Sequence, residues 1–134
     1  MFNLSQERQI LLTQKIMQNL DEWGLSAAQQ LNILDLPEDI RSRKLRAYHD
    51  DTPLPHTPEV EFRALRLLGI IDALRTTYPK NLMMGARWMA KPHRRFQNRH
   101  PLQVMLEEGS SGVNSVLAEL DCTYAWDLSG SSAK

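Results

Sequence analysis

The first stripe of apolar residues follows Ser5, a residue type favoured at the N-terminal cap of a helix. Within the segment QERQILLTQKIMQNLDEW, the apolar positions recur every three or four residues, which is the spacing of one helical face. This stripe consists of Leu12, Ile16, Leu20 and Trp23. Gly24 comes next and suits a helix stop, so the pattern predicts a helix that begins after Ser5 and ends at Gly24.

Two shorter helices are predicted after this one. Ser26 caps a helix over residues 27–34, and Pro37 suits the first position of a third helix over residues 37–48. Asp35 stands in the turn between them, where a short polar side chain supports local hydrogen bonding. Three short helices separated by brief turns are the pattern of a helix-turn-helix unit.

Prolines then interrupt the helical pattern in DDTPLPHTPE, residues 50–59, and predict an extended link. Thr57 and Pro58 form a cap and first position for a long helix. Its apolar positions step by four and three, and the regular stripe includes Val60, Ala64, Leu67, Ile71 and Leu74. The stripe fits the central core helix of a second unit, and it also fits a homodimer seam. We therefore assign these five residues to dimerisation and leave both interpretations open.

The remaining helices are shorter. Pro79 ends the long helix, LMMGARWMA forms the next one, and Pro101 begins a helix that Gly109 closes. A last helix follows Ser111. The sequence thus predicts an all-α protein with a helix-turn-helix-like unit and a second small helical domain. The expected ranges are 1–50 for the first unit, 51–58 for the link, 59–128 for the second domain and 129–134 for a flexible tail.

Composition limits the classes of function. The 134 residues are 42% hydrophobic, and 16 Lys and Arg balance 16 Asp and Glu, so only a local patch can attract nucleic acid or a membrane. The single Cys122 excludes an internal disulfide and fits a reducing compartment. With no signal peptide pattern and no apolar run of membrane-spanning length, we expect a cytoplasmic protein that does not bind membranes.

Enzyme chemistry finds little support in the sequence. The four histidines, which would be the natural metal ligands, are His49, His56, His93 and His100. No two of them have the spacing of four residues that places ligands on one helical face, and no Cys or acidic motif completes a site. There is also no Gly-rich phosphate loop. We expect no metal, no cofactor and no catalytic residue.

A basic cluster lies in ARWMAKPHRRFQNRHPLQVMLEEG, residues 86–109. Its cations are Arg87, Lys91, Arg94, Arg95 and Arg99. They fit either a solvated surface or an interface, where the planar guanidinium group is favoured because it pairs with carboxylates. Trp88 and Phe96 in the same segment fit core positions better than contact positions.

The order of these parts resembles the Xre/MbcA/ParS family of antitoxins. The resemblance rests on LDEWGLSAAQQLNILDLP, the proline-rich link, the long helix ending in YP, and the segment ARWMAKPHRRFQNRHPLQVMLEEGSSGVNSVLAEL. It implies a helix-turn-helix domain followed by a toxin-binding domain. The sequence departs from the family where glycines often precede the Pro-Leu helix, since Gln97 and Asn98 stand there.

The resemblance also implies partners. It implies a homodimer that binds and inhibits a RES-type toxin, which destroys NAD, and that represses its own operon. The basic cluster would then contact the toxin together with the C-terminal end, from Trp126 to Lys134, which would plug the active-site cleft.

Operator DNA would be bound by the first unit. The third predicted helix carries Arg41, Arg43, Lys44 and Arg46, and the start of the second helix adds Ser26, Gln29 and Gln30. Glu38 and Asp39 would lie at the N-terminal end of the third helix, where two carboxylates repel phosphate. The alternative is a helix-turn-helix transcriptional regulator without a toxin partner.

Overall fold

The computed structural model describes residues 3–128. Within this range, the side chains of Leu82 and of residues 122–128 are not described. Within this range the chain is all-α, and a single bridge between His93 and Arg99 is the only β pairing. The chain divides into two compact units, Met1–Leu67 and Leu68–Lys134. Among the described residues, no helix is both long enough and apolar enough to span a bilayer.

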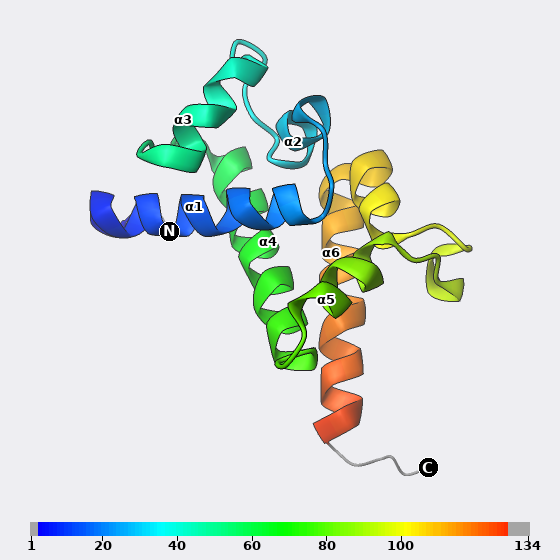
Figure 1. The fold of residues 1–134 in the computed structure, drawn as a ribbon. Coiled ribbons are helices and arrows are strands. Elements are labelled where there is room, and N and C mark those ends of the chain that lie inside the picture. Colours follow the sequence, from blue (N-terminus) through cyan, green and yellow to red (C-terminus); the bar gives the residue numbers. More distant parts are fainter. Residues whose placement is uncertain (1–2, 129–134) are drawn as a thin grey trace. The chain divides into compact units, whose positions relative to one another are not determined.

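The first unit begins with α1 (Gln6–Glu22) and α2 (Ala27–Ile33), as the apolar pattern predicts (Figure 1). The Ser5 hydroxyl accepts a hydrogen bond from the Arg8 N–H at 3.3 Å, which caps α1. Gly24 follows α1 with φ of 78°, a left-handed conformation that costs a glycine little. Ser26 and Gln29 form a reciprocal capping box at the start of α2.

The third helix differs from the prediction. Pro37 does not begin a helix, because the Ile40 N–H closes a turn on the Pro37 carbonyl at 3.0 Å. A 3₁₀ turn, η1 (Ser42–Lys44), leads instead into α3 (Leu45–Asp50). Between residues 37 and 48 only Leu45 and Tyr48 are buried. Residues 37–44 therefore have no buried apolar stripe whose packing would stabilise a helix.

Two polar contacts hold the first unit together around Asp21, at the end of α1. One carboxylate oxygen of Asp21 accepts a hydrogen bond from the Gln30 amide at 2.8 Å. The other lies 2.6 Å from Nε2 of His49 on α3. Asp21 therefore connects α2 and α3 to α1, against which α3 also packs.

The proline-rich link and the first half of α4 (Pro58–Thr77) belong to the first unit. Leu54 is buried, and its N–H donates to the Thr13 hydroxyl at 3.3 Å. Arg63 on α4 is only 6% exposed and donates to the carbonyls of Asn32 and Ile33 at the end of α2. These contacts explain why the division between the units lies within α4, beyond the link where the sequence suggests it.

The second unit contains the rest of α4, α5 (Leu82–Ala90), the 3₁₀ turn η2 (Arg94–Phe96) and α6 (Pro101–Leu128). Small residues let these helices approach one another, since a Cβ on Gly69 would lie 3.2 Å from Leu117 and one on Gly85 would lie 3.4 Å from Leu74. The predicted helix over LMMGARWMA is confirmed, with Asn81 as its cap.

Helix α6 is broken at Gly109, where the sequence predicts a helix stop. Gly109 has φ of 62° and ψ of −133°, a backbone conformation that favours glycine. The break brings Gly112 against the first part of the helix. A Cβ on Gly112 would lie 2.3 Å from the Val104 carbonyl oxygen, so the two parts of α6 touch through backbone atoms.

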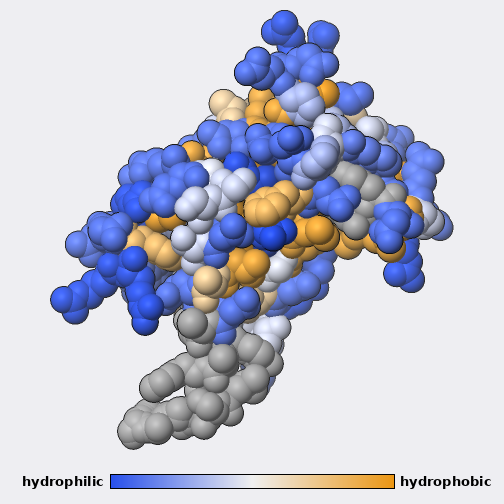
Figure 2. Space-filling model, turned by 180° about the vertical axis from the view of Figure 1, so that it is seen from behind, coloured by the Kyte–Doolittle hydropathy of each residue, from blue (hydrophilic) through white to orange (hydrophobic). Residues whose placement is uncertain are grey.

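The interior of the described chain is apolar, and the surface is mixed. Ile16, Leu20 and Trp23 of the first predicted stripe are buried. On the face shown in Figure 2, hydrophobic residues show between hydrophilic ones. The large apolar side chains that stay exposed are Leu4, Leu11, Leu65, Met83 and Met84.

Replacing Gly112 by Ala should destabilise the fold severely, because the added methyl group meets backbone atoms that no rotamer change can move away. We expect a loss of about 3 kcal/mol in the free energy of unfolding, measured by urea denaturation. Ser111→Ala, at the exposed neighbouring position, should change it by less than about 0.5 kcal/mol. Equal effects of the two substitutions would contradict the close approach.

Arg63→Leu should also destabilise the chain, because the Ile33 carbonyl loses its guanidinium donor while the site stays buried. The expected loss is about 2 kcal/mol in the free energy of unfolding. Arg75→Leu, which changes an exposed Arg on the same helix, is the control and should be near neutral. A neutral Arg63→Leu would show that the end of α2 does not depend on this contact.

Candidate functional site

The second unit separates its charges along the chain. Residues 80–99 contain six cations and no carboxylate, whereas residues 101–121 contain four carboxylates and no Lys or Arg. The cations are Lys80, Arg87, Lys91, Arg94, Arg95 and Arg99, and the carboxylates are Glu107, Glu108, Glu119 and Asp121. Helix α5 and η2 therefore carry the positive side of the unit, and α6 carries the negative side.

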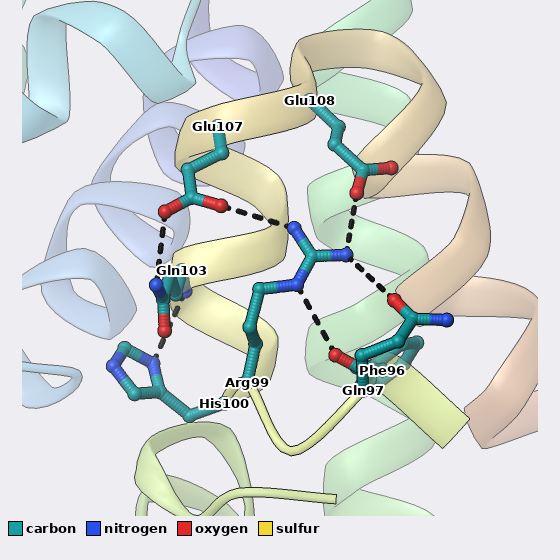
Figure 3. Close-up of polar contacts among 7 residues, drawn as sticks. All are labelled: Phe96, Gln97, Arg99, His100, Gln103, Glu107 and Glu108. Carbon is teal, nitrogen blue, oxygen red and sulfur yellow. Dashed lines mark hydrogen bonds and ion pairs between the residues drawn. The ribbon is translucent and has the colours of Figure 1, made fainter. Parts of the chain in front are cut away.

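Arg99 joins the two sides (Figure 3). Its guanidinium group donates to Glu107 at 3.0 Å and to Glu108 at 2.6 Å, both on α6. The same group donates to the Phe96 carbonyl at 3.1 Å and to the Gln97 side-chain oxygen at 3.2 Å. One planar cation thus holds the loop before α6 against the first turns of that helix.

The pKa values of this cluster shift in the directions that these contacts require. Hydrogen bonds from the Gln103 amide and from Arg99 lower the pKa of Glu107 below its ordinary value of 4.5, because both donors favour the ionised carboxylate. Hydrogen bonds to Glu108 and Glu107 raise the pKa of Arg99, so Arg99 stays charged.

The loop from His93 to Arg99 is tightly closed. The His93 N–H donates to the Arg99 carbonyl at 3.2 Å, and the Asn98 N–H donates to the His93 carbonyl at 3.0 Å. Gln97 and Asn98 adopt left-handed conformations, with φ of 54° and 64°. The backbone thus follows a left-handed path at two residues that are not glycine.

Aromatic rings support the same loop from inside. The His93 ring lies 4.8 Å from the Trp88 ring and meets the edge of Phe96 at 6.3 Å, measured between ring centroids. Nε2 of His93 lies 3.0 Å from the Trp88 carbonyl oxygen, so Nε2 carries a proton and donates it. Phe96 is buried, and His93 links it to the end of α5.

The predicted toxin-binding residues fall into distinct groups. Arg87, Lys91 and Arg94 are exposed, and no carboxylate among the described residues pairs with them. Arg95 is exposed but lies 3.6 Å from Glu119. Arg99 is paired with Glu107 and Glu108 on α6. The Trp126 side chain and Lys134 lie outside what the structure describes.

Residues 82–122 match the family model for the C-terminal toxin-binding domain of Xre/MbcA/ParS antitoxins. This match supports an antitoxin role for the chain. The resemblance is thereby confirmed for the segment that contains α5, η2 and most of α6. No curated protein and no solved structure matches the chain significantly.

The antitoxin match leaves the first unit outside its range, and there the structure separates the predicted DNA contacts. Gln30 is only 4% exposed and donates to Asp21 and to the Leu25 carbonyl, so its side chain is not available to a phosphate. The side chains of Ser26 and Gln29 are exposed and form the capping box. Their placement leaves DNA binding by α2 a prediction.

The cations expected on the third helix lie on three different elements. Arg41 is extended, Arg43 and Lys44 belong to η1, and Arg46 belongs to α3. Arg41, Arg43 and Lys44 nevertheless line one open hollow of about 350 Å³, together with Asp39. Burial raises the pKa of the Tyr48 hydroxyl, and the nearby Asp39 carboxylate raises this pKa further. Asp39 therefore affects a core side chain as well as the charge of the hollow.

The five residues assigned to a dimer seam are buried within one chain. They are Val60, Ala64, Leu67, Ile71 and Leu74. Burial is what the core-helix interpretation expects, and a second chain could reach these side chains only if the fold opened. Homodimerisation itself stays a prediction.

Met83 and Met84 are 69% and 38% exposed on α5. In the sequence they form part of an apolar run, which does not mark them as surface residues. The signal that could have identified them is the spacing of α5, because Gly85 and Met89 face inward and leave the other positions on the outer face.

The Glu107 contacts predict a pH dependence. Because the folded pKa of Glu107 is lowered, its contribution to stability is complete above pH 4.5 and is lost as the pH falls through the folded pKa. Wild type should therefore melt above Glu107→Gln at pH 7, and the difference should shrink as the pH falls below 4.5. Thermal melting followed by circular dichroism would measure it.

Asp121→Asn, which removes another carboxylate from α6, is the control for lost charge on that helix. A difference between wild type and Glu107→Gln that stays constant from pH 7 to pH 3 would contradict the assigned ionisation of Glu107.

Proposed function

We propose that this chain is the antitoxin of a type II toxin–antitoxin pair, and that it binds and inhibits a RES-type toxin that degrades NAD. The observation that carries the proposal is the match of residues 82–122 to an antitoxin toxin-binding domain. It coincides with the exposed and unpaired cations Arg87, Lys91 and Arg94. The RES type of the toxin is proposed from the order of parts along the chain.

The proposed mechanism is stoichiometric occlusion of the toxin's active site. Each of the four histidines forms a polar contact within the chain. His49 lies against Asp21, His56 against Gln9 and His93 against the Trp88 carbonyl. His100 accepts from the Gln103 N–H and caps α6.

The test is rescue of growth. Cells that express the protein encoded beside this chain should stop growing and lose NAD, and co-expression of this chain should restore both. Inhibition by binding also predicts that the two proteins co-purify at fixed stoichiometry. A harmless neighbour, or a toxic one that this chain does not neutralise, would refute the proposed function.

Repression of its own operon is the second part of the proposal. It is supported by the hollow that Arg41, Arg43 and Lys44 line, since closely spaced cations suit a phosphate group. Glu38 and Asp39 lie in a turn before η1, so they do not occupy the start of a helix that enters a groove. A DNA-binding regulator without a toxin partner is the alternative, and failure of rescue together with tight operator binding would favour it.

DNA binding through the hollow predicts a strong dependence on salt. The logarithm of the affinity for duplex DNA from upstream of the gene should fall linearly with the logarithm of the salt concentration. Arg43→Gln should weaken binding at all sequences and reduce the slope by about one, as expected for loss of one phosphate contact. Arg8→Gln, on the exposed surface of α1, is the control. An unchanged slope in Arg43→Gln would exclude this hollow as the phosphate site.

A further inference from the structure

The outer face of α5 carries a stripe that begins apolar and becomes basic. Met83 and Arg87 are four residues apart, so they share one side of α5, and Lys91 follows directly after the helix as its C-cap residue. All three are exposed, and Met84 beside the stripe is 38% exposed. On the inner side Gly85 and Met89 are buried. The helix therefore has a packed face and a free one.

Among the described residues, no carboxylate forms an ion pair with the cations of this stripe. Glu107 and Glu108 bind Arg99 instead, and Glu119 lies against Arg95. Arg87 and Lys91, with Arg94 just beyond them, are thus left with positive charge directed to the surroundings. A partner that fits this face must bring carboxylates of its own.

The methionines argue for a protein partner over a nucleic acid. Met83 is 69% exposed, the highest exposure among the large apolar side chains described, and it lies beside Met84 at the start of the stripe. Methionine is flexible and polarisable and adapts its shape to an apolar partner surface. A phosphate backbone offers the cations a partner but gives these two side chains nothing to bury against.

Hydrogen bonds hold both ends of α5 in the free chain. The Asn81 side chain caps α5 at one end, accepting from the Met83 N–H at 3.1 Å. At the other end the contact of His93 with the Trp88 carbonyl and the bonds of Arg99 to α6 fix the chain that follows. Binding here therefore requires little ordering of the backbone, which preserves affinity.

We infer that Met83, Met84, Arg87, Lys91 and Arg94 form the docking surface for an acidic protein, whose apolar hollow receives the two methionines and whose carboxylates face the three cations. The inference rests on the proposed function, because the partner is the toxin. Arg99 is a positioning residue in this arrangement, and Arg95 lies beside Glu119. The surface thus differs from the basic cluster taken as a whole.

The test measures the affinity of purified full-length variants for the protein encoded beside this chain. Arg87→Glu combined with Lys91→Glu should weaken binding about 100-fold, and Met83→Ser about 10-fold, as expected for central contacts. Matched controls on α1 are Arg8→Glu for the charge change and Leu11→Ser for the apolar change, since both residues are exposed in the first unit. Both should bind like wild type. Circular dichroism checks that each variant is folded.

The outcomes separate this inference from the proposed function. If wild type and all variants bind equally, the docking surface is wrong although the antitoxin role stands. If wild type itself does not bind, the proposed function fails and the inference falls with it. If the α5 variants lose affinity for unrelated duplex DNA while they keep their affinity for the protein, the stripe serves nucleic acid and the inference is overturned.

Discussion

The second unit depends on the charge that Arg99 places between a loop and a helix. Without this guanidinium group, two neighbouring carboxylates of α6 would repel each other, and the Phe96 carbonyl and the Gln97 side chain would lose a shared donor. The same contacts pair Glu107 and Glu108, two of the carboxylates of α6, with Arg99. Arg87 on α5 and Lys91 at its C-cap form no ion pair with a described carboxylate, so the outer surface beside this internal pairing keeps its positive charge.

Most helices follow from the sequence because local signals and burial agree. Ser5 caps α1 and Pro101 begins α6 where the sequence predicts helix starts, and Gly109 interrupts α6 where it predicts a stop. The third helix of the first unit is the exception. Pro37 is a good first residue by itself, but the residues after it bury too little apolar surface to support a helix, and a turn is formed instead. Local propensity predicts elements only where packing supports it.

The candidate site was predictable in its charge but not in its contacts. The run of cations between Arg87 and Arg99 is visible in the sequence, whereas the carboxylates that bind two of them lie on the following helix. Which cations remain unpaired depends on how the loop folds back. Likewise Gln30 looks like a surface residue of α2 and is buried in the structure because Asp21 accepts its amide.

The sharing of α4 between the two units has an evolutionary consequence. The first unit takes Leu54 from the link and Arg63 from a helix whose second half belongs to the other unit. Recombination at the proline-rich segment would therefore separate Arg63 from the carbonyls at the end of α2 to which it donates hydrogen bonds. The two halves of this chain are not interchangeable modules at that point, and an exchange that preserves both units must carry the first half of α4 along with the N-terminal helices.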